Sequence, residues 1–271
     1  MKVKNIANFI LQKIDKNKDH LKDQFFSKNK ETNTKYFILD NLLPNEFVLN
    51  AYNNFPKEIS KWLYMDTFRE KKYTYKELDR LDNNIVANLT DSFHDHDVIK
   101  SISEITNIND LVSDPSLYAG GISRMDYGHF LNPHVDNSHD GNRKKYRRLN
   151  LLFYVTPDLE EKDGGNLELW DTKVLKPLKI PCKFNRLIVM ETNPFSYHSV
   201  DRINKDVKRC CVSNYYFSDL SPSGKDYYHV TSFLGRPNQN FRRTYGRVDN
   251  FLRNTFVKLT GLSRGRNHKR S

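Results

Sequence analysis

Between about Leu117 and Ser218 the sequence alternates between short β-rich segments and turn residues, and this pattern restricts the fold more than any other feature. Gly120-Gly121, Asp163-Gly164-Gly165 and Pro194 are among the breaks. The segments that they separate are SLYAGGISRMDY, RLNLLFYVT, NLELWD, VLKPLKIP, RLIVMET and CCVSNYYFS. Many short strands at this spacing predict a β-sandwich or barrel. Alternating β and α units are absent, which argues against a doubly wound fold.

The main domain is expected over residues 36–235, with a β-rich core over about 117–218. The apolar run YFIL at its start predicts a strand. Before this domain, residues 1–35 are polar and rich in lysine, and we expect a helical extension there. Within the domain, two helical pieces are expected, around 76–90 and 96–112.

Residues 236–271 predict a basic helix followed by a tail. Five apolar residues fall on one face of this helix: Val248, Phe251, Leu252, Phe256 and Leu259. We expect this amphipathic helix to pack its apolar face on the β core.

The net charge of +11 is concentrated at the C-terminus. Residues 232–271 contain ten Lys or Arg and a single acid, Asp249, so the remainder of the chain is close to neutral. A basic tail can bind nucleic acid or an acidic partner, or it can keep the chain in solution. We favour the solubilising interpretation over nucleic-acid binding.

The three cysteines, Cys182, Cys210 and Cys211, lack the spacing of a disulfide framework or a cysteine-rich zinc site. We therefore expect a reduced, cytoplasmic protein. The sequence has no run of about 18 apolar residues, and its N-terminus lacks the apolar stretch of a signal peptide. These features predict no membrane partner.

A candidate metal site lies in the segment NPHVDNSHD, where His134 and Asp136 are two residues apart. Positions i and i+2 of a strand share a face, so the imidazole and the carboxylate can bind one ion together. The best third ligand is His198, which follows the segment RLIVMET and the turn at Pro194. Two histidines and one carboxylate form the facial triad of non-haem iron(II) oxygenases, which leaves coordination positions open.

Other histidines offer rival sites. The run HDHD at 94–97 is richer in ligands, but it has no β context, and we interpret it as a solvated face. His139 lies beside the turn at Gly141 and is expected to be exposed. An HxD pair alone is a weak signal in a chain with nine histidines, so the interpretation of His134 depends on its context.

Arg209 supplies that context, because it opens the apolar segment RCCVSNYYF. A dicarboxylate cosubstrate needs a buried cation, and a guanidinium group binds a carboxylate bidentately while it stays charged. Strand alternation places four residues on one face: Arg209, Cys211, Ser213 and Tyr215. Lys208 would point to the opposite face, so we favour Arg209 as this cation.

Four segments in their observed order resemble the prolyl 4-hydroxylase-like branch of the 2-oxoglutarate/iron(II)-dependent dioxygenases. They are GGISRMDYGHFLNPHVDN, RRLNLLFYVTPDLEEKDGGNLELWD, FNRLIVMETNPFSYHSV and KRCCVSNYYFS. The resemblance covers about residues 36–235 and is densest over 119–218. It implies a mainly β fold with flanking helices, built on a double-stranded β-helix, or jelly-roll, core.

This resemblance also implies an activity. His134, Asp136 and His198 would bind Fe(II) and carry catalysis, and Arg209 would bind 2-oxoglutarate as the cosubstrate. Ascorbate would serve as an accessory reductant. The implied reaction couples oxidative decarboxylation of 2-oxoglutarate to hydroxylation of a substrate C–H.

Three functions stay open from the sequence. The first is hydroxylation of a prolyl residue in a protein or peptide, and the second is the same chemistry on a sugar, amino acid or natural-product intermediate. The third is a non-catalytic β-barrel binding module whose basic C-terminus contacts nucleic acid. Tyr127, Asn150 and Tyr154 are each either pocket or core residues, whereas Trp170 is expected to be a packing anchor.

Overall fold

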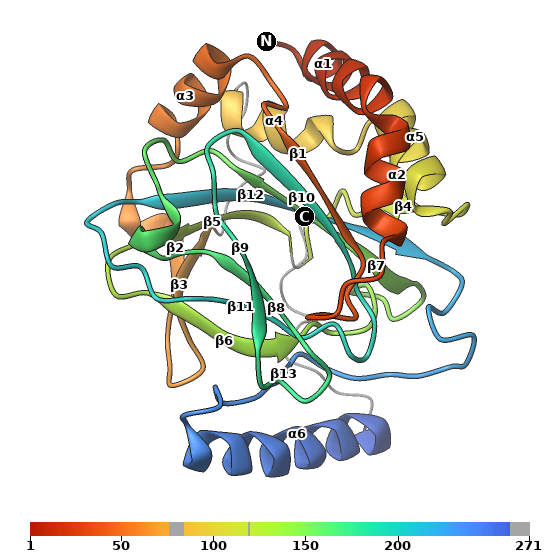
Figure 1. The fold of residues 1–271 in the computed structure, drawn as a ribbon, viewed down its shortest axis with the longest axis vertical. Coiled ribbons are helices and arrows are strands. Elements are labelled where there is room, and N and C mark those ends of the chain that lie inside the picture. The colour runs from red at the N-terminus through yellow and green to blue at the C-terminus, as the bar shows by residue number, and fades with distance from the viewer. Residues whose placement is uncertain (76–83, 119, 261–271) are drawn as a thin grey trace.

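The strands of the computed structural model form one antiparallel sheet that curls on itself (Figure 1). The structure describes residues 1–75, 84–118 and 120–260. Its helices are α1 (Val3–Lys16), α2 (Lys18–Phe26), α3 (Asn45–Asn53), α4 (Ile85–Ser92), α5 (His96–Thr106) and α6 (Asn240–Thr260). Its strands are β1 (Tyr36–Asp40), β2 (Trp62–Asp66), β3 (Glu70–Tyr75), β4 (Val112–Ser113), β5 (Gly121–Met125), β6 (Phe130–Val135), β7 (Tyr146–Tyr154), β8 (Leu167–Trp170), β9 (Pro177–Ile180), β10 (Arg186–Glu191), β11 (His198–Val200), β12 (Arg209–Ser218) and β13 (Ser232–Phe233).

The strand order shows how the sheet closes on itself. Along the sheet the strands run β1-β10-β7-β12-β5-β3-β6-β11-β8-β9. Strand β3 joins the two halves, because Tyr73 and Thr74 pair with β5 whereas Glu70 and Lys71 pair with β6. The curl brings β6 and β11 opposite β7 and β12, and one cavity is lined from both pairs. This is the expected jelly-roll architecture, and it also recruits strands from outside residues 117–218.

Alternation along β7 divides its side chains between the apolar core on one face of the sheet and the cavity on the other face. Leu149, Leu151 and Phe153 point to the convex face, where they join the large core beneath the helices. Asn150, Leu152 and Tyr154 point into the barrel and line its cavity. Because successive residues of a strand face opposite sides, each face of this sheet can be specialised independently.

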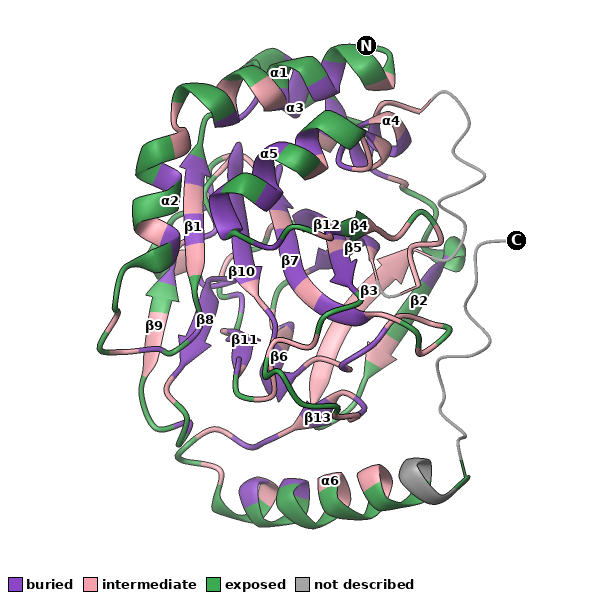
Figure 2. Ribbon diagram, turned by 90° about the vertical axis from the view of Figure 1, so that its right-hand side faces the viewer, coloured by how far each residue is buried: buried purple, intermediate pink, exposed green. Residues whose placement is uncertain are grey.

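The N-terminal extension forms helices, as expected, and these helices belong to the main core. Ile6, Ile10 and Ile14 lie on one face of α1 and are fully buried. They pack in the same cluster as residues of β7, β10 and β12. Figure 2 shows the corresponding pattern, in which the outward sides of α1 and α2 are exposed, β1 is of mixed burial and β10 is buried.

The C-terminal helix α6 is present, but the expectation that its apolar face packs on the β core is wrong. Val248, Phe251, Leu252 and Phe256 are 55%, 71%, 60% and 55% exposed. The opposite face of the helix contacts the core through polar side chains. These side chains satisfy backbone groups at the sheet edge, and an apolar face could not do so.

The helices expected in the central polar region are shorter than predicted. α4 begins within the first expected range, 76–90, and runs two residues beyond it, whereas α5 lies within the second, 96–112. Residues 76–83 of the first range are outside the described part of the chain. The hairpin of β2 and β3 was not anticipated. No helix in the described ranges is both long and apolar enough to span a membrane.

Replacing Ile10 with Ala should lower the free energy of unfolding by about 2–5 kcal/mol, because the change leaves a cavity in the core. The neighbouring Phe9 is 40% exposed, so Phe9→Ala is the matched control and should cost less than about 1 kcal/mol. Urea denaturation followed by circular dichroism measures both. A loss below about 1 kcal/mol for Ile10→Ala as well would show that the extension is not part of the cooperative core.

Candidate metal centre

The pairing of β6 with β11 assembles the predicted metal site. His134 near the end of β6 lies directly opposite His198, the first residue of β11. Asp136 follows β6 immediately, and its carboxylate oxygens lie 3.5 Å from Nε2 of His134 and 3.6 Å from Nε2 of His198. One ligand atom from each residue lies within 4.8 Å of the others. The structure therefore brings together the three residues that the sequence singled out.

Hydrogen bonds hold both imidazoles in the orientation that metal binding requires. Nδ1 of His134 lies 3.0 Å from the carbonyl oxygen of Asn132, and Nδ1 of His198 lies 3.0 Å from that of Ser196. A carbonyl can only accept, so each Nδ1–H donates and each Nε2 keeps a free lone pair. Such outer contacts are typical of metal-ligating histidines. Two imidazole nitrogens and one carboxylate are a donor set that fits Fe(II).

The protonation states also fit a metal site. Burial alone would raise the pKa of Asp136, but the positive charge of Arg147, with contributions from His198 and His134, holds that pKa well below its usual value. Burial and the neighbouring His134 lower the pKa of His198 to about 4. At neutral pH the carboxyl is therefore ionised and His198 is neutral, as metal ligands must be.

Two residues of β7 hold the Asp136 carboxylate in place. Nη1 of Arg147 lies 3.2 Å from Oδ2 of Asp136, and Nδ2 of Asn150 donates to the same oxygen at 2.7 Å. The guanidinium of Arg147 also lies 4.1 Å from the ring centre of Tyr215. Both contacts fall on Oδ2 and thus orient the carboxylate, with its other oxygen, Oδ1, 3.5 Å from the Nε2 of His134.

Arg147 is the functional residue that sequence reasoning missed, and a β-bulge explains why. Residues 147 and 150 differ in parity, so regular alternation would send their side chains to opposite faces. The register against β12 shifts here: Leu149 pairs with Tyr216 and Arg147 with Phe217, which leaves Arg148 as an extra residue. A bulge re-aims the side chains that follow it, so both reach Asp136.

The triad opens into a cavity of about 120 Å³ inside the barrel. The expected face of β12 lines this cavity with Arg209, Cys211, Ser213 and Tyr215. Lys208 is exposed instead. Among the residues that the sequence left open, Asn150 and Tyr154 line the cavity, whereas Tyr127 is 66% exposed and lies elsewhere.

The double glycine of the DGGN segment shapes the surroundings of Arg209. Nε of Arg209 donates to the carbonyl oxygen of Gly165 at 2.7 Å. A Cβ on Gly165 would lie 2.8 Å from Cδ of Arg209, and the backbone there has a positive φ of 76°. Gly164 has a φ of 78°, and its Cβ would clash with the carbonyl of Arg202 at 1.9 Å. Only glycine allows this close approach of backbone to side chain.

The remaining candidates do not form a second metal site among the described residues. In the 94–97 run, His94 is only partly exposed and its Nε2 contacts Asn214 at 2.9 Å. Asp95 caps α5, so the solvated-face interpretation holds only for the exposed His96 and Asp97. His139 is buried beside Tyr146 at 4.3 Å between ring centres, so the expectation that it is exposed is wrong.

Trp170 is a packing anchor, as expected. Its side chain is 2% exposed, and the indole Nε1–H donates to Ser199 at 2.8 Å. A buried tryptophan usually satisfies its N–H in this way, and this one does not line the metal cavity.

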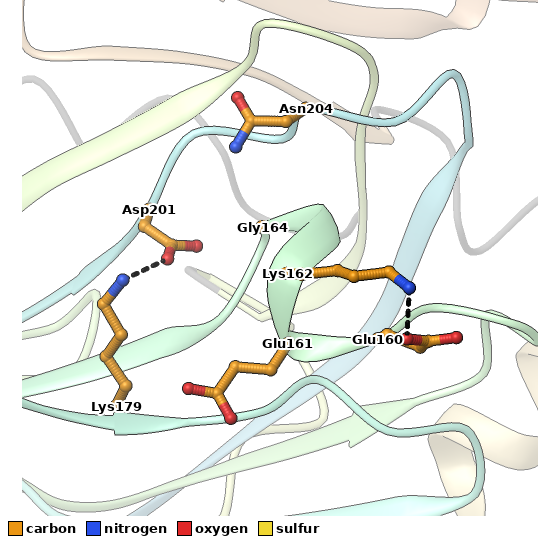
Figure 3. A pocket seen from close by; sticks show the side chains of 7 residues that line it. All are labelled: Glu160, Glu161, Lys162, Gly164, Lys179, Asp201 and Asn204. Carbon is orange, nitrogen blue, oxygen red and sulfur yellow. Dashed lines mark hydrogen bonds and ion pairs between the residues drawn. The ribbon is translucent and has the colours of Figure 1, made fainter.

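A second, larger hollow lies on the surface around residues 160–164 (Figure 3). Four of its five charged side chains form ion pairs: Lys162 with Glu160 at 2.9 Å, and Lys179 with Asp201 at 3.1 Å. The hollow shares no lining residue with the metal cavity. It is therefore a solvated surface feature with paired charges, without the converging ligands of the barrel.

Comparison with known proteins agrees with this geometry. Residues 120–217 match the family model described as the 2OG-Fe(II) oxygenase superfamily. Among curated proteins, prolyl 3-hydroxylase OGFOD1 of Mus musculus is 29% identical over 79 residues, which amount to 26% of this chain and 14% of that protein. The aligned region is thus a small part of that relative.

Solved structures show the same fold at low sequence identity. A prolyl 4-hydroxylase from Phytophthora capsici has a TM-score of 0.52 and 17% identity, covering 93% of this chain and 77% of that one. The non-haem α-ketoglutarate-dependent epimerase SnoN from nogalamycin biosynthesis has a TM-score of 0.50 and 11% identity, covering 76% and 86%. The matched segment, residues 120–217 of the 271-residue chain, contains all three residues of the triad.

Replacing Arg147 with Met should weaken metal binding about 10- to 100-fold, because the Asp136 carboxylate loses its ionic partner. Arg148→Met is the matched control, since that side chain donates to the carbonyl of Leu220 and not to Asp136. Anaerobic titration with Fe(II), or with Co(II) as a spectroscopic substitute, measures the affinity. A folded Arg147→Met protein with unchanged metal affinity would contradict the positioning role.

Proposed function

We propose that this protein is a 2OG-Fe(II) oxygenase and that it hydroxylates a C–H of a prolyl residue in a protein or peptide. Its iron ligands are His134, Asp136 and His198. Arg209 anchors 2-oxoglutarate. The overall reaction converts substrate, 2-oxoglutarate and O₂ into hydroxylated substrate, succinate and CO₂. When bound, the iron supplies the activation of O₂. The protein's own residues bind and orient the iron, 2-oxoglutarate and the substrate, and they keep water away from the reacting groups.

The observation that carries the cosubstrate assignment is a buried cation without an anionic partner. Arg209 is 3% exposed and forms no ion pair with a residue of the described ranges. A buried charge without a counter-charge is costly by several kcal/mol. The distal carboxylate of 2-oxoglutarate would remove this cost through a bidentate pair with the guanidinium.

A second polar group beside Arg209 supports the same role. The ring of Tyr154 lies 4.9 Å from the guanidinium, and its hydroxyl has no hydrogen-bond partner in the described structure. Burial raises the pKa of Tyr154 well above its usual value, although Arg209 opposes the shift, so the hydroxyl keeps its proton. A protonated hydroxyl can donate to a carboxylate, and we assign Tyr154 that role.

Part of the cavity lining is apolar. Ile122, Met125 and Leu167 line the same cavity as the triad and Arg209. Apolar walls around a bound cosubstrate would strengthen the ionic contacts of Asp136 and Arg209 and limit side reactions.

The proposed substrate class has separate support. The matched curated protein is a prolyl 3-hydroxylase, and a structure with the same fold is a prolyl 4-hydroxylase. SnoN, which has the same fold, acts in nogalamycin biosynthesis, and this favours a small molecule as the alternative substrate. Succinate release with proline-containing peptides, compared with free amino acids and sugars in the presence of ascorbate, would separate the two.

Replacing Asp136 with Ala, or His198 with Ala, should abolish 2-oxoglutarate turnover in the absence of substrate, because either change removes a metal ligand. Succinate release with Fe(II) measures this turnover. Trp170→Phe, which alters a buried residue outside the cavity, is the control and should retain activity. Full turnover in either ligand variant would refute the ligand assignment, whereas no turnover in the unmodified protein would favour the non-catalytic binding module.

Replacing Arg209 with Gln should weaken 2-oxoglutarate binding about 10- to 100-fold, since a hydrogen bond to a charged group contributes about 1.5–3 kcal/mol. The visible charge-transfer band of the anaerobic Fe(II)–2-oxoglutarate complex provides the titration. Lys208→Gln, which removes the neighbouring exposed cation, should leave the affinity unchanged.

A second variant tests the same contact from the other side. Gly165→Ala should displace Arg209 and weaken 2-oxoglutarate binding, because its new Cβ would meet Cδ of Arg209. Gly224→Ala is the matched control, since Gly224 has a similar φ of 69° with nothing within 4 Å. If both glycine variants weaken binding equally, the effect would reflect backbone strain and not the position of Arg209.

A further inference from the structure

The helix α6 is docked on the protein through its polar face. Arg243 donates through Nη1 to the carbonyls of Val174 and Gly235. Asn250 donates to the carbonyl of Phe233, and Asn254 accepts from the backbone N–H of Val230. All four hydrogen bonds go to backbone groups of β13, of residues close to it in the chain, or of Val174. The polar side of the helix therefore faces the rest of the protein.

The opposite face of α6 is apolar and exposed. Its residues are Phe241, Tyr245, Val248, Phe251, Leu252 and Phe256, which range from 44% to 83% exposed. A soluble helix normally has the reverse arrangement, with its apolar stripe facing the core. Both views show α6 as a single long helix at one end of the molecule, with the sheet on one side only (Figures 1 and 2).

The charge around this face restricts what can cover it. The only acid in α6, Asp249, is already paired with Arg69. Arg242 and Arg247 flank the apolar stripe, and the sequence that follows adds Arg264 and Arg266 without an acid. A second copy of the chain would place these cations against one another, and like charges across an interface are unfavourable. An anionic partner avoids this repulsion.

We propose that the apolar face of α6 binds the surface of an anionic lipid membrane. An amphipathic helix with aromatic residues on one side and basic residues at its borders lies in the plane of the lipid headgroups. The 21 residues of α6 give it a length of about 30 Å. Tyr245 at the border of the apolar stripe contacts the ring of Phe68 at 5.3 Å between ring centres, and the more exposed Phe241, Phe251 and Leu252 remain available to a plane. The basic residues would add electrostatic attraction to acidic headgroups.

Flotation of the full-length protein with vesicles tests this proposal. Vesicles of phosphatidylglycerol and phosphatidylcholine in equal parts should carry the protein, whereas phosphatidylcholine alone should not. Phe251→Gln should weaken the partitioning about tenfold, because a buried aromatic side chain is lost from the lipid. Arg247→Gln should weaken it about fivefold, and added salt should reduce that difference.

The matched control is Phe195→Gln, since Phe195 is 62% exposed but lies outside α6. This variant should float like the wild type, and substrate-independent succinate release should be unchanged in the α6 variants. Equal binding to neutral and anionic vesicles, or no binding to either, would overturn the proposal. So would a dimer in solution that Phe251→Gln converts to a monomer. Binding to polyglutamate but not to vesicles would identify an acidic polymer as the partner, and would also overturn it.

Discussion

The charge of the Asp136 carboxylate is the constraint on which the rest of the site depends. Its side chain is only 13% exposed, so the charge must be balanced from within the barrel. Arg147 provides the balance, and a bulge in β7 is needed to bring it there. The curl of the sheet is needed in turn, because Arg147 and Asp136 lie on opposite halves of it. The ion pair between Arg147 and Asp136 therefore depends on the curl of the sheet, and the metal site depends on that ion pair.

The alternation of side chains along a strand could predict those site residues that lie on regular strands. His134 and Arg209 were accessible in this way, because alternation relates each one to its neighbours on the same face, whereas Tyr154 was left open between pocket and core. Arg147 was not accessible, because the bulge at Arg148 exists only in the pairing with β12. Register between distant strands is a tertiary property, and a single sequence does not contain a local signal for it.

The same limit explains where the predicted fold was incomplete. The hairpin of β2 and β3 has alternating aromatics at Trp62 and Tyr64, but five of the seven residues at 66–72 are charged, so the segment lacks the apolar pattern of the other strands. For α6 the periodicity was correct and the helix is present, but periodicity identifies an apolar face without stating what covers it. Here the polar face is occupied by backbone contacts at β13, and the apolar face is left outward.

The contacts of β13 place α6 close to the metal site. Phe233 of β13 pairs with His134, and its ring stacks on that imidazole at 5.0 Å between ring centres. The carbonyl of the same Phe233 accepts from Asn250 of α6. One residue therefore contacts both the metal-ligating histidine and the helix that carries the exposed apolar face. A surface bound to α6 would hold the barrel at a fixed orientation, so substrates presented by that surface would meet the cavity in a restricted geometry. Attachment would in this way contribute to substrate selection without any contact to the reacting atoms.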